Sequence, residues 1–231
     1  MSFNVVIPAR LNSSRLKEKV LIEIHGIPMV IHVAQRASLS GAKNIVIATD
    51  DTKIAEVASH YNLKSVMTNK NHLSGTDRCL EASDISMWSD QDIIVNVQAD
   101  EPLIDPVLIN LVAKNVTESE SGYVTACSEF KSYKEFLNPN NVKVVLDNHS
   151  HALYFSRSSI PYSAMANSSA LLLASASTRR RFIVMESVSR RNRKSRASAA
   201  DLETLANPIV WNASATGGIG PPGRFFLAIL R

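Results

Sequence analysis

Short apolar runs that alternate with helix-like segments constrain the fold of this 231-residue chain more than any other feature. Between the runs, apolar residues recur every three or four positions, as they do on one face of a helix. This alternation predicts β-α-β units and a parallel sheet flanked by helices, which is the α/β class. The expected strands are 5–7, 44–48, 65–67, 93–97, 122–127, 142–147 and 152–156, and the expected helices lie at 29–37, 54–58, 79–82 and 106–116.

Charge is divided unevenly along the chain. Residues 1–162 hold 15 Lys and Arg against 18 Asp and Glu, whereas residues 163–231 hold 10 against 3. The second part is also rich in Ser, Ala and Arg and shows no convincing periodicity. We therefore predict an α/β domain over 1–162 and an atypical basic segment over 163–231. An altered reading frame and a genuinely divergent segment both explain the change, and sequencing the source DNA distinguishes them.

The cysteines and the start of the chain bear on the cellular compartment. Cys79 and Cys127 lie far apart and lack a CxxC partner, which argues against a disulfide framework or a cysteine zinc site. No run approaches the roughly 18 apolar residues of a membrane span, and the first residues enter a strand without a signal-peptide pattern. We expect buried thiols, a cytoplasmic protein and no membrane partner.

Three cations, Arg10, Arg15 and Lys19, follow the first expected strand. Ligands of open parallel sheets bind at the carboxyl ends of the strands. Guanidinium groups make bidentate contacts to phosphate, and an ammonium group supplies a point charge. The three cations are therefore suited to wrap a triphosphate and to stabilise the charge that grows as pyrophosphate leaves. A solvated basic loop is the alternative interpretation.

A carboxylate follows another expected strand, in the run VNVQADEP at positions 95–102. A carboxylate at the end of a strand is a hard ligand that suits Mg²⁺ bound against an α-phosphate. We predict that Asp100 binds the metal and that Gln98 contacts the nucleotide or the sugar. A turn or cap residue is the alternative for Asp100.

Five motifs resemble those of the 3-deoxy-manno-octulosonate cytidylyltransferase family, the CMP-Kdo synthetases. They are PARLNSSRLKEK at 8–19, HLSGTDR at 72–78, VNVQADEP at 95–102, NPNNVKVV at 138–145 and ALYFSRSSIPY at 152–162. The first departs from the family's PARxxSxRLPGKPL at Lys17, Glu18 and Val20. Glu18 places a side chain and a negative charge where the family has glycine. The resemblance covers residues 1 to about 162.

The resemblance implies a Rossmann-like nucleotide-diphospho-sugar transferase fold, with a mostly parallel sheet flanked by helices. It also implies that CMP passes from CTP to 3-deoxy-D-manno-octulosonate (Kdo), for lipopolysaccharide synthesis, with Mg²⁺ as cofactor and a homodimer as the assembly. The implied catalytic residues are Lys19, Asp100 and Arg15. The implied nucleotide contacts are Ala9, Arg10, Ser14, Arg15, Lys19, Ser74, Gly75, Arg78 and Gln98. Arg157, and less directly Lys143, are the implied partners of the sugar acid.

Other interpretations stay open at this point. Ser74 is also a suitable helix cap, Lys143 an exposed strand residue, and Asp50 with Asp51 the start of a helix. A transferase for another sugar acid, such as a neuraminate, is one alternative function. Another is an inactive homologue with a basic tail, although its arginine runs lack the interleaved aromatic side chains of nucleic-acid binding proteins. The family's second metal-binding Asp has no counterpart in 163–231, so a native segment there predicts weak or absent activity.

Overall fold

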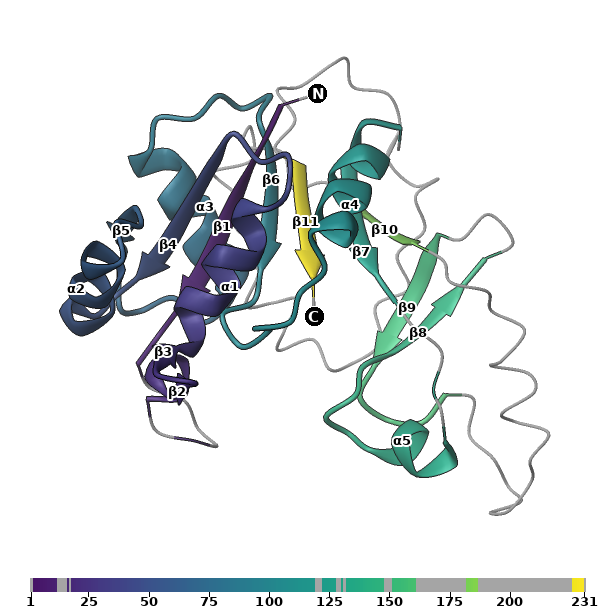
Figure 1. Cartoon of the computed structure of the whole chain (residues 1–231). Coiled ribbons are helices and arrows are strands. Elements are labelled where there is room, and N and C mark those ends of the chain that lie inside the picture. The colour runs from purple at the N-terminus through teal and green to yellow at the C-terminus, as the bar shows by residue number, and fades with distance from the viewer. Residues whose placement is uncertain are drawn as a thin grey trace.

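A mostly parallel sheet forms the centre of the molecule (Figure 1). The computed structural model describes residues 2–11, 16, 18–118, 122–127, 130, 132–147 and 151–160, together with the backbone of two strands at 182–186 and 226–230. Within this part, seven strands pair in the order β10-β7-β11-β6-β1-β4-β5. They are β1 (Phe3–Ala9), β4 (Asn44–Thr49), β5 (Ser65–Met67), β6 (Ile93–Val97), β7 (Gly122–Ala126), β10 (Phe182–Glu186) and β11 (Phe226–Leu230). Only β7 with β10 is an antiparallel pair among them.

Helices cover both faces of this sheet. They are α1 (Met29–Ser38), α2 (Thr52–His60), α3 (Gly75–Ile85) and α4 (Pro106–Glu118). In β1, Val5 and Ile7 belong to the core cluster that contains α1, α2 and α4, whereas Val6 belongs to the cluster that contains α3. Successive strand side chains point to opposite faces, so an apolar strand such as β1 is buried on both sides. The predicted α/β class and Rossmann-like architecture are confirmed.

Two smaller pieces lie beside the main sheet. The first follows the 3₁₀ helix η1 (Lys19–Leu21) and is a hairpin of β2 (Glu23–Ile24) and β3 (Ile27–Pro28). Both residues of its turn, His25 and Gly26, have positive φ, which matches the twist of a tight hairpin. The second is a lobe made of α5 (Tyr133–Leu137), β8 (Lys143–Leu146) and β9 (Ala152–Ser156), in which β8 and β9 pair with each other. The hairpin was not predicted, because strands of two residues carry no period.

Strands β10 and β11 belong to the part of the chain in which the sequence lacks periodicity. β11 lies between β6 and β7 and runs parallel to both, and β10 pairs with β7 at the edge. A short strand inside a sheet needs no alternation of apolar and polar residues, so periodicity does not reveal it. The described residues before and after position 162 therefore share one sheet.

The parallel strands bring four loops to one edge of the sheet. β1, β4, β5 and β6 all end on this side, because β1 is parallel to β4 and β6, and β4 is parallel to β5. The loops begin at Arg10, Asp50, Thr68 and Gln98. In open α/β sheets this carboxyl edge is where ligands bind.

Candidate functional site

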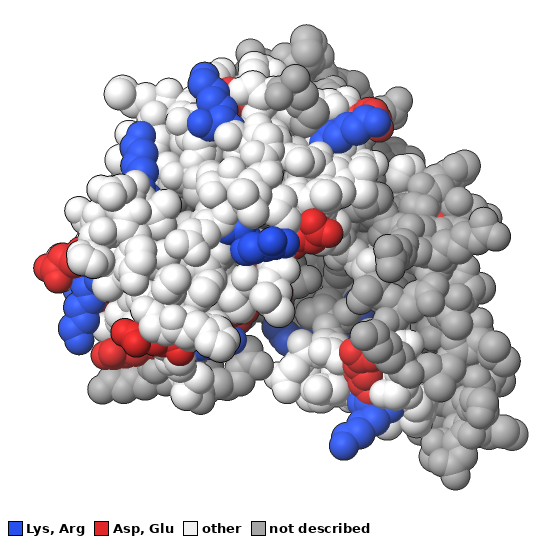
Figure 2. Space-filling view, viewed as in Figure 1, with Lys and Arg blue, Asp and Glu red and all other residues white. Residues whose placement is uncertain are grey.

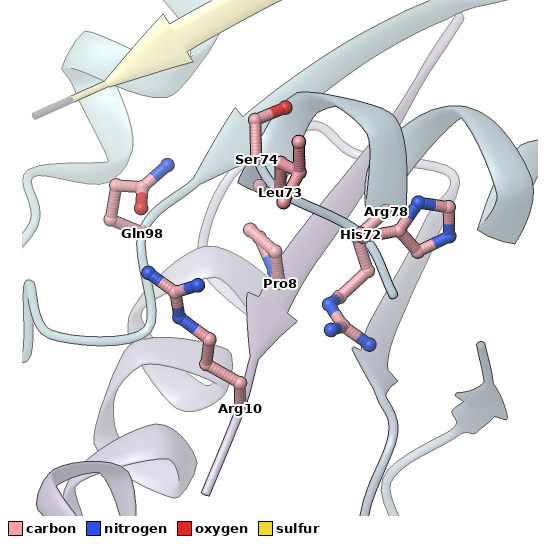
Figure 3. Close-up of a pocket in the computed structure, with 8 residues that line it drawn as sticks. Pro8, Arg10, His72, Leu73, Ser74, Arg78 and Gln98 are labelled. Carbon is pink, nitrogen blue, oxygen red and sulfur yellow. The ribbon is translucent and has the colours of Figure 1, made fainter. Parts of the chain in front are cut away.

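A small pocket opens at the carboxyl edge of the sheet (Figure 3). Its volume is about 90 Å³, which is below the roughly 300–1,000 Å³ of pockets that enclose a whole drug-sized ligand. Its walls are formed by Pro8, Arg10, His72, Leu73, Ser74, Gly75, Arg78 and Gln98. Five residues that the sequence predicted as nucleotide contacts thus line one hollow, which is sized for a fragment such as a base.

Arg10 and Gln98 line the pocket from the loops that follow β1 and β6. Figure 3 shows the Arg10 side chain extending toward the side on which Gln98 lies. Gln98 Nε2 donates to Asn96 Oδ1 at 3.1 Å, and Asn96 is buried within β6. This hydrogen bond orients the Gln98 amide, and Asn96 is a supporting residue that sequence reasoning missed.

Ser74 and Gly75 begin helix α3 at the pocket wall. The Ser74 hydroxyl accepts a hydrogen bond from the Asp77 backbone N–H at 3.1 Å and donates to Asp77 Oδ2 at 3.0 Å. Ser74 is therefore the N-cap of α3, as the alternative interpretation held. A Cβ at Gly75 would lie 3.3 Å from Pro8 Cγ, so glycine allows the loop to pack closely on β1.

Arg78 is buried in the pocket wall, where the Asp50 carboxylate balances its positive charge. Its Nη2 donates to Asp50 Oδ2 at 2.8 Å, and its Nη1 donates to Thr68 Oγ1. Only 3% of the Arg78 side chain and 14% of the Asp50 side chain are exposed. The predicted helix start at Asp50 and Asp51 is correct for Asp51 alone, whose side chain accepts from the Lys53 N–H. The partner role of Asp50 was not predicted.

A hydrogen-bonded pair, His72 and Glu81, lies on the same side of the pocket as Arg78 (Figure 3). His72 Nε2 donates to Glu81 Oε2, and the same carboxylate oxygen accepts from the Asn69 backbone N–H at 2.8 Å. Burial raises the pKa of Glu81, but the hydrogen bonds from His72 and Asn69 outweigh it, and the pKa falls below its ordinary 4.5. Glu81 is thus held as an anion that orients the His72 ring.

Lys19 and Asp100 form an ion pair between η1 and the loop that follows β6. Lys19 Nζ lies 2.7 Å from Asp100 Oδ2, and the side chains are 33% and 42% exposed. Burial and the Asp100 carboxylate raise the pKa of the neighbouring Glu101, while Lys19 acts in the opposite direction. Two of the three residues predicted to be catalytic, Lys19 and Asp100, are therefore in direct contact and accessible to a charged ligand.

Glu18, which stands where the family motif has glycine, adopts a left-handed backbone conformation, with φ 53° and ψ 28°. Its carboxylate lies 3.5 Å from Lys53 Nζ. Residues with a Cβ pay about 1–2 kcal/mol in this region of backbone space. The conformation explains why glycine suits this position.

We expect the Glu18→Gly variant to be more stable than Glu18→Ala by about 1 kcal/mol, because both lose the carboxylate but only glycine adopts positive φ without strain. Urea unfolding of the two variants under identical conditions measures the difference. An alanine variant as stable as the glycine variant would show that position 18 does not require the left-handed conformation.

Lys143 and Arg157 lie in the β8–β9 lobe and do not line the pocket. Lys143 is 2% exposed, so its interpretation as an exposed strand residue is wrong. Its Nζ donates to three backbone carbonyls, those of Asn138 at 2.7 Å, Asn141 at 3.0 Å and Arg157 at 2.9 Å. Burial, and then the charge of Arg157, lower the pKa of Lys143. Three carbonyl contacts use all three N–H donors of an ammonium group, which leaves none for a substrate.

The remaining predicted residues differ in how far they are buried, and two of them lie outside the described part of the chain. Arg157 is exposed, and its Nη1 donates to the Pro139 carbonyl at 3.2 Å. Ala9 is buried at the end of β1. Ser14 and Arg15 lie outside the described residues. Cys79 is a buried thiol, as expected, whereas Cys127 is only partly buried, so that prediction is wrong for Cys127.

Three further features of the described residues concern metal sites, surface charge and membrane spans. Among the residues that the structure describes, no group of three or more His, Cys, Asp or Glu side chains is placed to bind a metal ion. Figure 2 shows one face, on which the basic and acidic side chains of the described residues are interspersed rather than gathered by sign. No helix in the described part of the chain is both long and apolar enough to span a bilayer.

The chain is similar in sequence to known proteins. A family model described as cytidylyltransferase matches residues 4–213, and so extends past position 162. A 3-deoxy-manno-octulosonate cytidylyltransferase of Methylibium petroleiphilum is 48% identical over 163 residues, covering 70% of this chain and 62% of the relative. One of the same name from Serratia proteamaculans is 47% identical over 162 residues, covering 70% and 65%. The chain thus spans less than two thirds of the length of these relatives.

A solved structure is also similar over most of the chain. It is a CMP:2-keto-3-deoxy-manno-octonic acid synthetase in complex with CTP, at 28% identity and a TM-score of 0.62. The match covers 89% of this chain and 97% of the other. The similarity therefore reaches beyond the segment that the sequence motifs cover.

Proposed function

The chain belongs to the cytidylyltransferase family, and from that premise we propose that it transfers CMP from CTP to Kdo, giving CMP-Kdo and pyrophosphate for lipopolysaccharide synthesis. The observation that carries the proposal is the carboxyl edge of the sheet. There Arg10, Arg78 and Gln98 line a pocket, and the Lys19–Asp100 pair lies on loops from the same strands. The relatives at 47–48% identity support the choice of Kdo as acceptor.

Binding of CTP is assigned to residues from two connections, the one that follows β1 and the one between β5 and α3. The pocket between Pro8, Ser74 and Gly75 is the proposed site of the base. Arg10 and Lys19, with Arg15 and Ser14 assigned from the motif alone, bind the phosphates. Ala9 ends the strand beneath them and sets the course of the backbone at this point.

Asp100 is a suitable ligand for Mg²⁺. Mg²⁺ is usually held by one or two carboxylates, with water and substrate phosphates filling the other positions, so a full set of protein ligands is not needed. The Asp100 carboxylate is partly exposed and supplies a hard oxygen donor. When bound, the metal neutralises phosphate charge and polarises the α-phosphate. Mg²⁺ is thus the proposed cofactor, with Asp100 as its ligand.

Catalysis on this proposal rests on positioning and charge. The anomeric hydroxyl of Kdo attacks the α-phosphorus of CTP and releases its proton to solvent, the bond from that phosphorus to the oxygen bridging the β-phosphate breaks, and pyrophosphate leaves without a covalent enzyme intermediate. Lys19 and Arg15 stabilise the charge that grows on the leaving group. Lys19 exchanges its contact with Asp100 for phosphate oxygens when the nucleotide binds.

Arg157 is the proposed partner of the Kdo carboxylate, because it is exposed and a guanidinium matches a carboxylate in geometry. The substrate role first predicted for Lys143 becomes indirect. Lys143 holds the turn at Asn138–Asn141 and the Arg157 carbonyl together, and so supports Arg157.

The proposed assembly is a homodimer, and the proposed compartment is the cytoplasm. Light scattering after size-exclusion chromatography measures the molar mass and so tests the homodimer.

The test is pyrophosphate release from CTP with Mg²⁺, in the presence and absence of Kdo. We expect release that requires both substrates, and at least tenfold less of it when UTP replaces CTP or a neuraminate replaces Kdo. A missing hydrogen bond to a substrate costs about 1–3 kcal/mol, and a cost above about 1.4 kcal/mol corresponds to a loss of tenfold or more. Equal release with neuraminate would contradict the choice of acceptor, and Kdo-independent release would contradict transfer.

A further inference from the structure

The buried Asp50–Arg78 pair joins the loop that follows β4 to helix α3 at the carboxyl edge. Asp50 follows β4, and Arg78 lies in the first turn of α3, where it lines the pocket. The two side chains meet at 2.8 Å and are 14% and 3% exposed. Thr68, at the end of β5, accepts a hydrogen bond from the same guanidinium. Arg78 is therefore held in the pocket wall by the loops that follow β4 and β5.

A buried guanidinium needs such a partner. Removing a charge from water is costly, and removing one partner of a buried ion pair leaves the other uncompensated. The contacts with Asp50 and Thr68 use one N–H on Nη2 and one on Nη1, whereas a guanidinium has five N–H donors. Arg78 can thus present further donors to a ligand while its position is held from behind.

We propose that Asp50 is a positioning residue for CTP: it holds the Arg78 guanidinium in the pocket wall, so that Arg78 donates hydrogen bonds to acceptor atoms of the nucleotide. This inference rests on the proposed function, since it names a residue that acts in the same site. Asp50 itself touches Arg78 and not the pocket. Asp50 therefore affects CTP binding by holding Arg78 in place.

The main variant is Asp50→Asn, which keeps the shape of the side chain but removes the counter-charge. We expect it to raise the KM and the Kd for CTP by about tenfold or more, with kcat within about twofold, because Arg78 moves or loses its orientation. Calorimetric titration with CTP and Mg²⁺ and steady-state kinetics with Kdo measure these quantities. An unchanged KM and Kd would contradict the role of Asp50.

Asp51 offers matched controls, because it is the adjacent aspartate and caps α2. Asp51→Asn makes the same chemical change, preserves a good cap, and should leave both KM and melting temperature unchanged. Asp51→Ala removes the cap and should lower the melting temperature by about 2–4 °C without raising the KM for CTP. A comparable rise in KM for Asp51→Ala would mean that general destabilisation explains the Asp50 result.

A double variant separates positioning from a direct effect. If Asp50 acts through Arg78, Asp50→Asn combined with Arg78→Gln binds CTP as weakly as Arg78→Gln alone, and the two losses do not add. Additive losses would contradict action through Arg78. A wild-type chain that does not bind CTP would instead contradict the proposed function, whereas wild-type binding with normal binding by Asp50→Asn contradicts this inference alone.

Discussion

Replacing Asp100 with asparagine is expected to reduce Kdo-dependent pyrophosphate release by about 1,000-fold or more. Asparagine keeps the size of the side chain and can still accept a hydrogen bond from Lys19, which now lies 2.7 Å away. It loses the negative charge that is proposed to bind Mg²⁺, and a metal acting on a phosphoryl group stabilises the transition state by several kcal/mol. A loss of about 4 kcal/mol corresponds to this reduction in rate.

The matched control is Asp92→Asn, at the opposite end of strand β6. Asp92 precedes the strand and accepts from the Ser89 backbone N–H at 2.8 Å, away from the carboxyl edge. We expect its activity to stay within about twofold of wild type. Turnover by Asp100→Asn equal to that of Asp92→Asn would reject the metal role of Asp100.

Replacing Lys143 with methionine is expected to weaken the β8–β9 lobe by about 2–4 kcal/mol. Methionine fills a similar volume, but three backbone carbonyls lose their donor, and an unsatisfied buried group costs about 1–3 kcal/mol before the lobe relaxes. Hydrogen exchange at the amides of β8 reports this local opening. Protection there should fall by roughly 30- to 1,000-fold.

Lys134→Met is the control, because Lys134 is an exposed lysine in α5 of the same lobe. Surface substitutions usually change stability by less than about 0.5 kcal/mol, so its exchange rates should match those of wild type. Unchanged protection in Lys143→Met would contradict a structural role for Lys143. It would return Lys143 to the set of substrate contacts.

The main features of the fold could be predicted because the pattern in the first 160 residues is regular. Apolar strands such as β1 and β6 alternate with amphipathic helices, and this alternation identifies them. β11 has the same length as β6 but was not predicted, because the sequence around it lacks the helix-like segments that mark β6 as part of the alternation. The division into an α/β domain over 1–162 and an atypical basic segment over 163–231 stays a prediction. Sequencing of the source DNA tests whether an altered reading frame explains the second segment.

The candidate site could be predicted where function follows from position at the end of a strand. Arg10, Gln98 and Asp100 each follow a parallel strand, so topology alone brings them to one edge. The partner of Arg78 could not be predicted, because Asp50 is 28 residues away and its neighbour Asp51 already explained the helix start. Lys143 was misjudged for a similar reason, since its three carbonyl partners come from loops that only the folded lobe assembles.

Binding of CTP at the carboxyl edge of the sheet can be seen in a diffraction structure of the protein with CTP and Mg²⁺. We expect the base in the pocket between Pro8 and Gly75, the triphosphate in contact with Arg10 and Lys19, and Mg²⁺ on Asp100. Nucleotide density elsewhere on the molecule, with the Lys19–Asp100 pair intact and the pocket empty, would contradict it.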